Sequence, residues 1–150
     1  MMLRKIRWIS PVGLMILAVL FAGMVFAGPV SAAVLHTQDF SGGKPGSPWT
    51  YYSSDNNGRI EIKNGRLRMD RSPSGSNTLN EAVLTINLAG KENVVLEFFH
   101  QGANDENYTL SDTFTGHKNG DGVAISKDGQ RWFTIVNASE LGKSGGKNFS

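Results

Sequence analysis

The side chains best able to bind an ion lie in one polar stretch between residues 104 and 121. They are Asp105, Glu106, Asn107, Asp112, Asn119 and Asp121. Ca²⁺ takes about six to eight oxygen ligands from carboxylates, amides, carbonyls and water. We therefore predict a calcium site whose ligands come from Asp105, Asp112, Asn119 and Asp121. The alternative is a solvated loop in which the Asn, Asp and Gly residues serve turns.

The pattern around Asn119 is part of a known calcium-loop pattern. Asn119-Gly120-Asp121-Gly122 matches the second half of an Asp-x-Asn-x-Asp-Gly loop. His117 stands where the first ligand of that loop should be. Both interpretations of the stretch, the calcium site and the solvated loop, stay open at this point.

Aromatic side chains are the second group that suggests binding, because the apolar C–H faces of sugar rings stack on aromatic rings. The chain offers Trp49, Tyr51, Tyr52, Tyr108 and Trp132. Aromatic residues in strands more often pack in the core. Tyr108, which lies in the polar stretch, is therefore the best ligand-binding candidate, and Trp132 and Asn104 complete the predicted set.

Motifs that would indicate catalysis are not visible in the sequence. His36, His100 and His117 are dispersed, and the chain contains no His-x-His, His-Glu-x-x-His or Gly-x-Ser-x-Gly pattern. No spacing singles out a pair of carboxylates for acid–base chemistry. We expect a protein that is not an enzyme.

Residues 1–33 have the pattern of a signal peptide. Arg4, Lys5 and Arg7 precede an apolar run over 12–27, and small residues follow at 30–33. This pattern predicts a leader helix that is cleaved after Ala32 or Ala33, and a secreted or cell-surface protein. The alternative is an uncleaved anchor, but the run is shorter than the ~20 residues of a spanning helix. We expect no stable membrane insertion after cleavage.

The net charge changes when the leader is removed. The whole chain has 15 Lys and Arg against 13 Asp and Glu, and the leader holds three of the bases and none of the acids. The mature part therefore carries 12 bases and 13 acids, which does not favour a nucleic-acid partner. The chain has no Cys, so packing rather than disulfides must hold an exported domain together.

The mature chain is predicted to consist of short strands joined by turns. The clearest hairpin pairs residues 59–62 with 66–69 around Asn64-Gly65, because polar and apolar residues alternate on both sides of a turn dipeptide. A second hairpin joins residues 123–125 to 132–135, and its Asp128-Gly129 predicts a type I′ turn.

Further strands are predicted over residues 34–40, 49–52, 81–88 and 94–100, and loops over 101–120 and 137–150. No helical stripe appears outside the leader. These elements predict an all-β fold, an antiparallel β-sandwich over residues 34–136 followed by a loop-like tail over 137–150.

The order of these motifs resembles one known architecture. It includes Ile62-Lys63-Asn64-Gly65-Arg66-Leu67, residues 84–88 and 95–98, and the hairpin over 121–129 with Trp132. Together they resemble the secreted jelly-roll modules of the concanavalin A-like lectin/glucanase superfamily, especially laminin-G-like and MAM-like modules of bacterial surface proteins. The resemblance implies a jelly roll. Such modules have more strands than we predict after Val136, so a jelly roll truncated at the C-terminus is expected.

The resemblance and the residues together lead to one functional expectation. We expect a secreted, non-catalytic module that binds carbohydrate or another extracellular surface ligand, with calcium as an assisting ion. One alternative is a structural or adhesive domain of an envelope protein without a small ligand. A glucanase-type hydrolase is a third possibility, but the chain lacks the Glu-x-Asp-x-x-Glu run that glucanases of this superfamily use.

Overall fold

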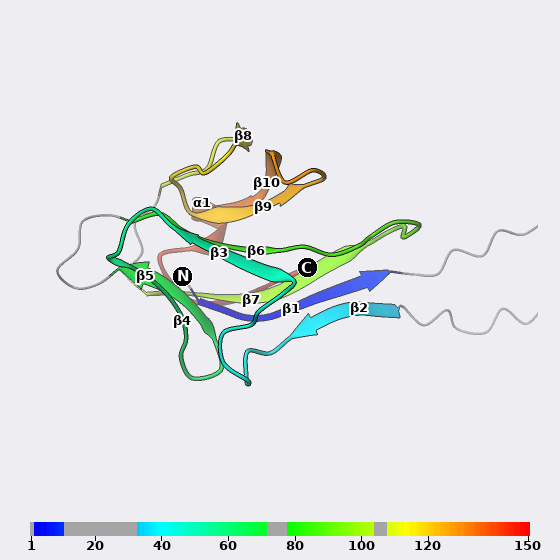
Figure 1. Cartoon of the computed structure of the whole chain (residues 1–150), viewed down its shortest axis with the longest axis horizontal. Helices are drawn as coiled ribbons and strands as arrows, with labels where there is room; N and C mark the ends of the chain where they lie inside the picture. The colour runs from blue at the N-terminus through cyan, green and yellow to red at the C-terminus, as the bar shows by residue number, and fades with distance from the viewer. Residues whose placement is uncertain (1, 11–32, 72–77, 104–107) are drawn as a thin grey trace, which may run out of the picture.

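The computed structural model describes residues 2–10, 33–71, 78–103 and 108–150 (Figure 1). In these ranges the chain is all-β, as predicted, with a single short helix. The elements are β1 (Met2–Ser10), β2 (Ala33–Gln38), β3 (Trp49–Ser53), β4 (Gly58–Ile62), β5 (Leu67–Arg71), β6 (Asn80–Leu84), β7 (Val95–Ala103), β8 (Thr113–Thr115), β9 (Gly122–Ser126), β10 (Arg131–Asn137), α1 (Ala138–Leu141) and β11 (Ser144–Phe149).

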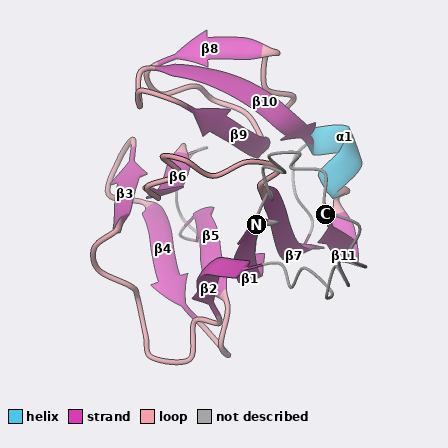
Figure 2. Cartoon of the chain, turned by 90° about the vertical axis from the view of Figure 1, so that its right-hand side faces the viewer, coloured by secondary structure: helices cyan, strands magenta, loops and turns pink. Residues whose placement is uncertain are grey.

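The strands form three antiparallel groups. A six-stranded sheet has the order β11-β7-β1-β5-β4, and β2 also pairs with β1. A second sheet has the order β8-β10-β9, and β3 pairs with β6. In Figures 1 and 2 the three-stranded sheet lies on one side of the molecule and the six-stranded sheet on the other, with β6 between them.

The predicted hairpin of β4 and β5 is confirmed. Ile60 pairs with Met69 and Ile62 with Leu67. Asn64 and Gly65 both have positive φ, 54° and 64°, as a type I′ turn requires. The four apolar side chains share one face, where Leu67 and Met69 are buried and the two isoleucines pack against the core.

The hairpin of β9 and β10 also forms, but its turn differs from the type I′ prediction. Gly129 has a φ of 75°, whereas Asp128 is not among the residues with positive φ. The Asp128 carboxylate instead accepts hydrogen bonds from the backbone N–H groups of Arg131 (3.0 Å) and Gln130 (2.8 Å). These bonds, and one from the Ser126 hydroxyl, hold the pKa of Asp128 below its usual range.

The C-terminal segment differs from the loop-like tail that the sequence predicts. Asn137 caps α1 in a capping box with Glu140, a signal visible in the sequence as Asn-x-x-Glu. β11 then pairs with β7 along its whole length, although its glycines are poor strand formers. Gly146 lies so close to β7 that an added Cβ would be 2.5 Å from the Phe99 ring. The Phe149 ring stacks on Phe98 at 4.7 Å between centroids.

Two of the predicted strand boundaries also shift. The strand predicted over residues 81–88 ends at Leu84. The backbone N–H of Thr85 still donates to the carbonyl of Pro48 opposite it, but Pro48 has no N–H to return a bond, so the β3–β6 ladder stops there. β7 runs on to Ala103, and β8 forms at 113–115, both within the stretch predicted as loop.

The N-terminal residues take a place in the sheet. Met2–Ser10, which the sequence assigns to the signal peptide, form β1 between β7 on one side and β2 and β5 on the other. The apolar run of the leader and most of the predicted cleavage region lie outside the described residues, so the leader and its removal stay predictions. Within the described ranges, no helix is long and apolar enough to cross a membrane.

The core gathers side chains from all three strand groups. Phe40 packs edge-on against Trp49, with ring centroids 5.7 Å apart at 60°. The other buried members of this cluster are Leu67, Met69, Phe98, Val136 and Leu141. Because Val136 comes from β10 and Leu141 from α1, the three-stranded sheet is fixed to the rest of the domain through this core.

We expect Leu67→Ala to lower the free energy of unfolding of the full chain by about 2–5 kcal/mol, because Leu67 is 0% exposed and truncation would leave a cavity. The control is Ile125→Ala, at a side chain 44% exposed, which should cost less than about 1 kcal/mol. Urea denaturation followed by fluorescence measures both. Equal losses in the two variants would contradict this description of the core.

Candidate functional site

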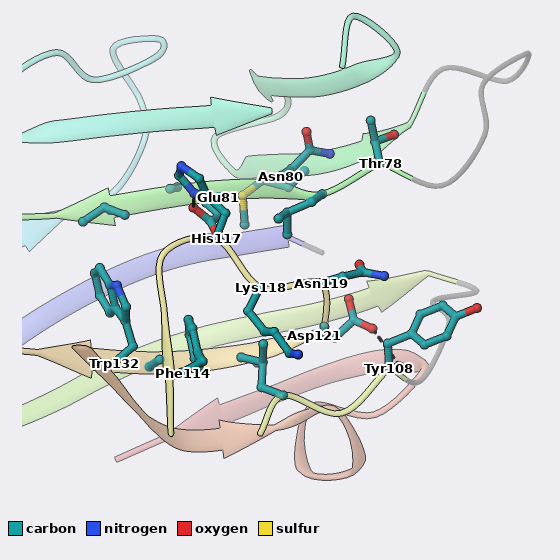
Figure 3. A pocket seen from close by; sticks show the side chains of 18 of the residues that line it. Thr78, Asn80, Glu81, Tyr108, Phe114, His117, Lys118, Asn119, Asp121 and Trp132 are labelled. Atoms are coloured by element: carbon teal, nitrogen blue, oxygen red, sulfur yellow. Dashed lines mark hydrogen bonds and ion pairs between the residues drawn. The ribbon is translucent and has the colours of Figure 1, made fainter. Parts of the chain in front are cut away.

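A cavity of about 750 Å³ lies beside the three-stranded sheet. One wall consists of β6 and the residues just before it, together with the end of β5. The other wall consists of β8, β9, β10 and the loop 116–121 that joins β8 to β9 (Figure 3). The cavity therefore lies between strands that are distant in sequence and that the core holds together.

One end of the cavity is aromatic. Phe114 of β8 and Trp132 of β10 are direct partners in the antiparallel register. Their rings stack with centroids 6.4 Å apart and planes 13° from parallel. Both side chains are half-buried and both line the cavity. The pair therefore gives this end of the cavity an apolar aromatic surface.

The opposite end of the cavity is polar and is tied together by backbone contacts. The Asp121 carboxylate accepts a hydrogen bond from the Tyr108 N–H at 3.2 Å, and the Asp121 N–H donates to the Tyr108 carbonyl at 2.6 Å. Asn80 and Asn119 line the same end (Figure 3). This end offers amide and carboxylate groups that can hydrogen-bond to hydroxyls.

The glycines of Asn119-Gly120-Asp121-Gly122 serve packing. A Cβ added at Gly120 would be 2.8 Å from the Leu110 side chain, and one added at Gly122 would be 2.7 Å from it. Gly120 also has a φ of 157°. Because Leu110 is buried, both glycines are needed to bring the loop down onto it. The glycine spacing that resembles a calcium loop therefore has a structural reason of its own.

The loop 116–121 is also attached to the opposite wall of the cavity. The His117 imidazole lies flat on the Tyr52 ring, with centroids 3.6 Å apart, and its Nδ1 is 2.5 Å from a Glu81 carboxylate oxygen. Tyr52 and Glu81 are themselves direct partners between β3 and β6. His117 therefore links the loop of one sheet to the strands of another beside the cavity, where both His117 and Glu81 line it (Figure 3).

Asp70 is the most strongly paired carboxylate on the cavity wall. Its oxygens accept hydrogen bonds from Arg59 across the hairpin, at 2.8 Å, and from Arg68 two residues earlier, at 2.6 Å. Burial opposes ionisation, but the two guanidinium groups outweigh it, so the pKa of Asp70 lies below its usual value of 3.8. Both arginines are thus held in ion pairs.

Some of the residues predicted to bind a ligand or calcium line the cavity, and others do not. Tyr108, Trp132, Asn119 and Asp121 all line the cavity. Asp112 does not line it, and its carbonyl accepts a hydrogen bond from the Thr134 N–H. Asn104 and Asp105 lie outside the described residues.

The calcium site stays a prediction. Among the residues that the structure places, no three His, Asp or Glu side chains come together as a metal site would need. Asn119 and Asp121 are the two predicted ligands that share the cavity, and Asp121 already accepts a hydrogen bond from Tyr108.

Sequence reasoning missed Phe114, His117 and Glu81 as site residues. Phe114 lies in a stretch that its polar neighbours mark as a loop, and only the β-prone triplet Thr-Phe-Thr indicates a strand there. Nothing in the sequence pairs His117 with Glu81, because 36 residues separate them.

Comparison of the chain with models of protein families, with curated proteins and with solved structures finds no match.

Asp70→Asn tests the pairing on the cavity wall. Since folding lowers the pKa of Asp70, its contribution to stability is full above pH 3.8 and is lost as the pH falls through the lower pKa of the folded state. We expect the variant to lose about 1 kcal/mol at neutral pH, and the difference from wild type to shrink in acid. Urea denaturation at neutral pH and in a series below pH 3.8 measures this.

The matched control is Asp112→Asn, which makes the same chemical change at an exposed side chain outside the cavity. It should leave the free energy of unfolding nearly unchanged at every pH. A loss for Asp70→Asn that stays constant into acid would show that the ionised carboxylate is not the stabilising form.

Proposed function

We propose that this chain is a secreted, non-catalytic module that binds carbohydrate in the cavity beside β8, β9 and β10. The observation that carries the proposal is the stacked pair of Phe114 and Trp132 at one end of a cavity whose other end is polar. Sugars have both kinds of surface, an apolar face on the ring and hydroxyls around it. An aromatic platform beside amides and carboxylates complements both.

The dimensions of the cavity support a ligand of a few sugar units. Small-molecule sites commonly enclose about 300–1,000 Å³, and this cavity has about 750 Å³. Asn119 and Asp121 are at hand to hydrogen-bond to hydroxyl groups, and Tyr108, at 50% exposure, extends the polar end outward. The lining thus favours a polyhydroxylated ligand over an apolar one.

The state of the carboxylates supports a binding function over hydrolysis. Asp70 is held by two arginines, Glu81 by His117, and Asp121 by the backbone of Tyr108. A glycosidase needs one carboxylic acid to donate a proton and a second carboxylate to act on the sugar or on water. Pairing with two guanidinium groups holds Asp70 ionised, which does not suit an acid donor.

We further propose that the fold is an antiparallel β-sandwich of the jelly-roll kind, as in the concanavalin A-like modules, and that residues 1–33 direct its export. The antiparallel pairing and a core fed from several sheets support the first part. The basic residues, apolar run and small residues of the N-terminus support the second.

Trp132→Ala tests the aromatic platform. We expect the affinity for the best ligand on a glycan array to fall about tenfold or more, equivalent to about 1.4 kcal/mol, because the stacked face is lost. The neighbouring substitution Phe133→Ala is the matched control, since alternation along β10 places Phe133 on the other face, where it is 45% exposed. Calorimetric titration with the selected glycan measures both. Equal losses, or a chain that binds no glycan, would refute the proposal.

Calcium assistance, proposed through Asn119 and Asp121, is tested by thermal melts of the full chain in EDTA and in millimolar CaCl₂. We expect calcium to raise the melting temperature of the wild type, since an ion that binds the native state stabilises it. Asp121→Asn should abolish the rise, because it removes the charge and keeps an oxygen for the Tyr108 hydrogen bond. A wild-type melt that is indifferent to calcium would count against the ion.

One observation favours the alternative of an adhesive or structural module without a small ligand. Ile125, Phe133 and Ile135 are each more than 40% exposed, and Ile125 pairs directly with Phe133. This apolar face of β9 and β10 points away from the Trp132 side of the strand. If every glycan fails while Phe133→Ala reduces adherence to cell envelopes, the alternative is preferred.

A further inference from the structure

The six-stranded sheet contains a strand that the exported protein is proposed to lose. β1 is an interior strand: it pairs with β7 along one edge, and with β2 and the start of β5 along the other. Cleavage after Ala32 or Ala33, which is part of the proposed function, would remove the whole of β1 and leave β2, β5 and β7 in the mature chain.

Removal of β1 would leave a gap bordered by backbone groups. In the full chain, the backbone groups on one edge of β7 between Val95 and Gln101 pair with β1, as do those on the facing edges of β2 and of Leu67 and Arg68 in β5. Unpaired strand edges of this kind readily pair with another chain. Phe98 and His100, both buried, lie on β7 along this border, so the gap also reaches the core.

We propose that the exported domain accepts an extended strand from a partner polypeptide in the place of β1. This is β-strand addition, in which backbone hydrogen bonds give affinity and alternate side chains give specificity. The proposal rests on removal of the leader. The strand seated there in the full chain shows that the place accommodates an extended segment antiparallel to β7.

The side chains of β7 define the chemistry of that partner strand. Leu96, Phe98 and His100 share the inward face of β7, so the residues opposite them should be apolar. Glu97 points to the other face, so a basic residue should stand opposite it. In the full chain, β1 fills these places. Trp8, Ile6 and Leu3 stand opposite Leu96, Phe98 and His100 in the strand register, and Arg7 stands opposite Glu97. The partner strand should contain no proline in its paired stretch.

The test uses the protein as a cell exports it. The full chain is produced in a bacterium with a secretion pathway, and intact mass identifies the N-terminus of the exported form. The probe is a synthetic peptide with the sequence of residues 2–10, and the control peptide carries Ile6→Pro. We expect an exported form that begins at Ala33 or Val34, binds one copy of the probe, and melts several degrees higher with it. The control peptide should not bind.

Charge reversal on β7 tests the orientation of the bound strand. Glu97→Lys in the exported form should weaken binding of the basic probe about tenfold, because it places like charges opposite each other. The matched control is Asp112→Lys, the same kind of reversal at an exposed acid before β8, which should leave probe binding unchanged. An equal effect of both substitutions would overturn the proposed placement.

Four other outcomes would overturn the proposal. The exported form could start at residue 33 or 34, melt cooperatively as a monomer and fail to bind the probe. It would then have no binding site for an added strand. An exported form that keeps residues 2–10 has the place filled within its own chain. A stable dimer that excludes the probe has a second copy there. An exported form that shows no cooperative melt, either with or without the probe, does not fold around this strand. Glycan binding is measured separately on the same preparations, so failure of this proposal is distinct from failure of the carbohydrate proposal.

Discussion

The structure depends on backbone pairing along both edges of β7, the nine-residue strand that joins β11 to the rest of its sheet. Its sequence, Val-Leu-Glu-Phe-Phe-His-Gln-Gly-Ala, is rich in strand-forming residues and carries Phe98 and His100 into the core. Gly102 lies so close to the backbone of residues 142 and 143 that a Cβ would be 2.6 Å from the Gly142 carbonyl. Loss of pairing on either edge therefore affects the core directly.

A few contacts between strands hold the two walls of the cavity in place. The Asn80 side chain donates to the Asp70 carbonyl at 2.8 Å and so fixes β6 against β5. His117, with Glu81 and Tyr52, fixes the loop of the three-stranded sheet to the β3–β6 pair. The stacking of Phe114 on Trp132 is thus set by the register of β8 and β10 within one sheet. The distance between these rings and the opposite wall of the cavity is set by the contacts of His117 with β3 and β6.

The sequence predicts local elements better than it predicts the site, for a physical reason. The β4–β5 hairpin is encoded within eleven residues by alternation and Asn64-Gly65, and it forms as predicted. The sequence does not predict β11, because its glycines have low strand propensity, and Gly146 is used for close approach to Phe99. Four predicted ligand residues do line one cavity. Glu81 and Phe114 became site residues only through long-range pairing, which no local pattern reports.

The most direct test of the carbohydrate account uses the indole N–H signals of Trp49 and Trp132 in NMR spectra of the ¹⁵N-labelled full chain. Trp49, at 5% exposure, is part of the core, and Trp132 lines the cavity. The protein is titrated with soluble laminari-, cello- and chito-oligosaccharides. The account predicts that one of these moves the Trp132 signal saturably and leaves the Trp49 signal in place. A Trp132 signal that stays unmoved by every oligosaccharide would contradict it.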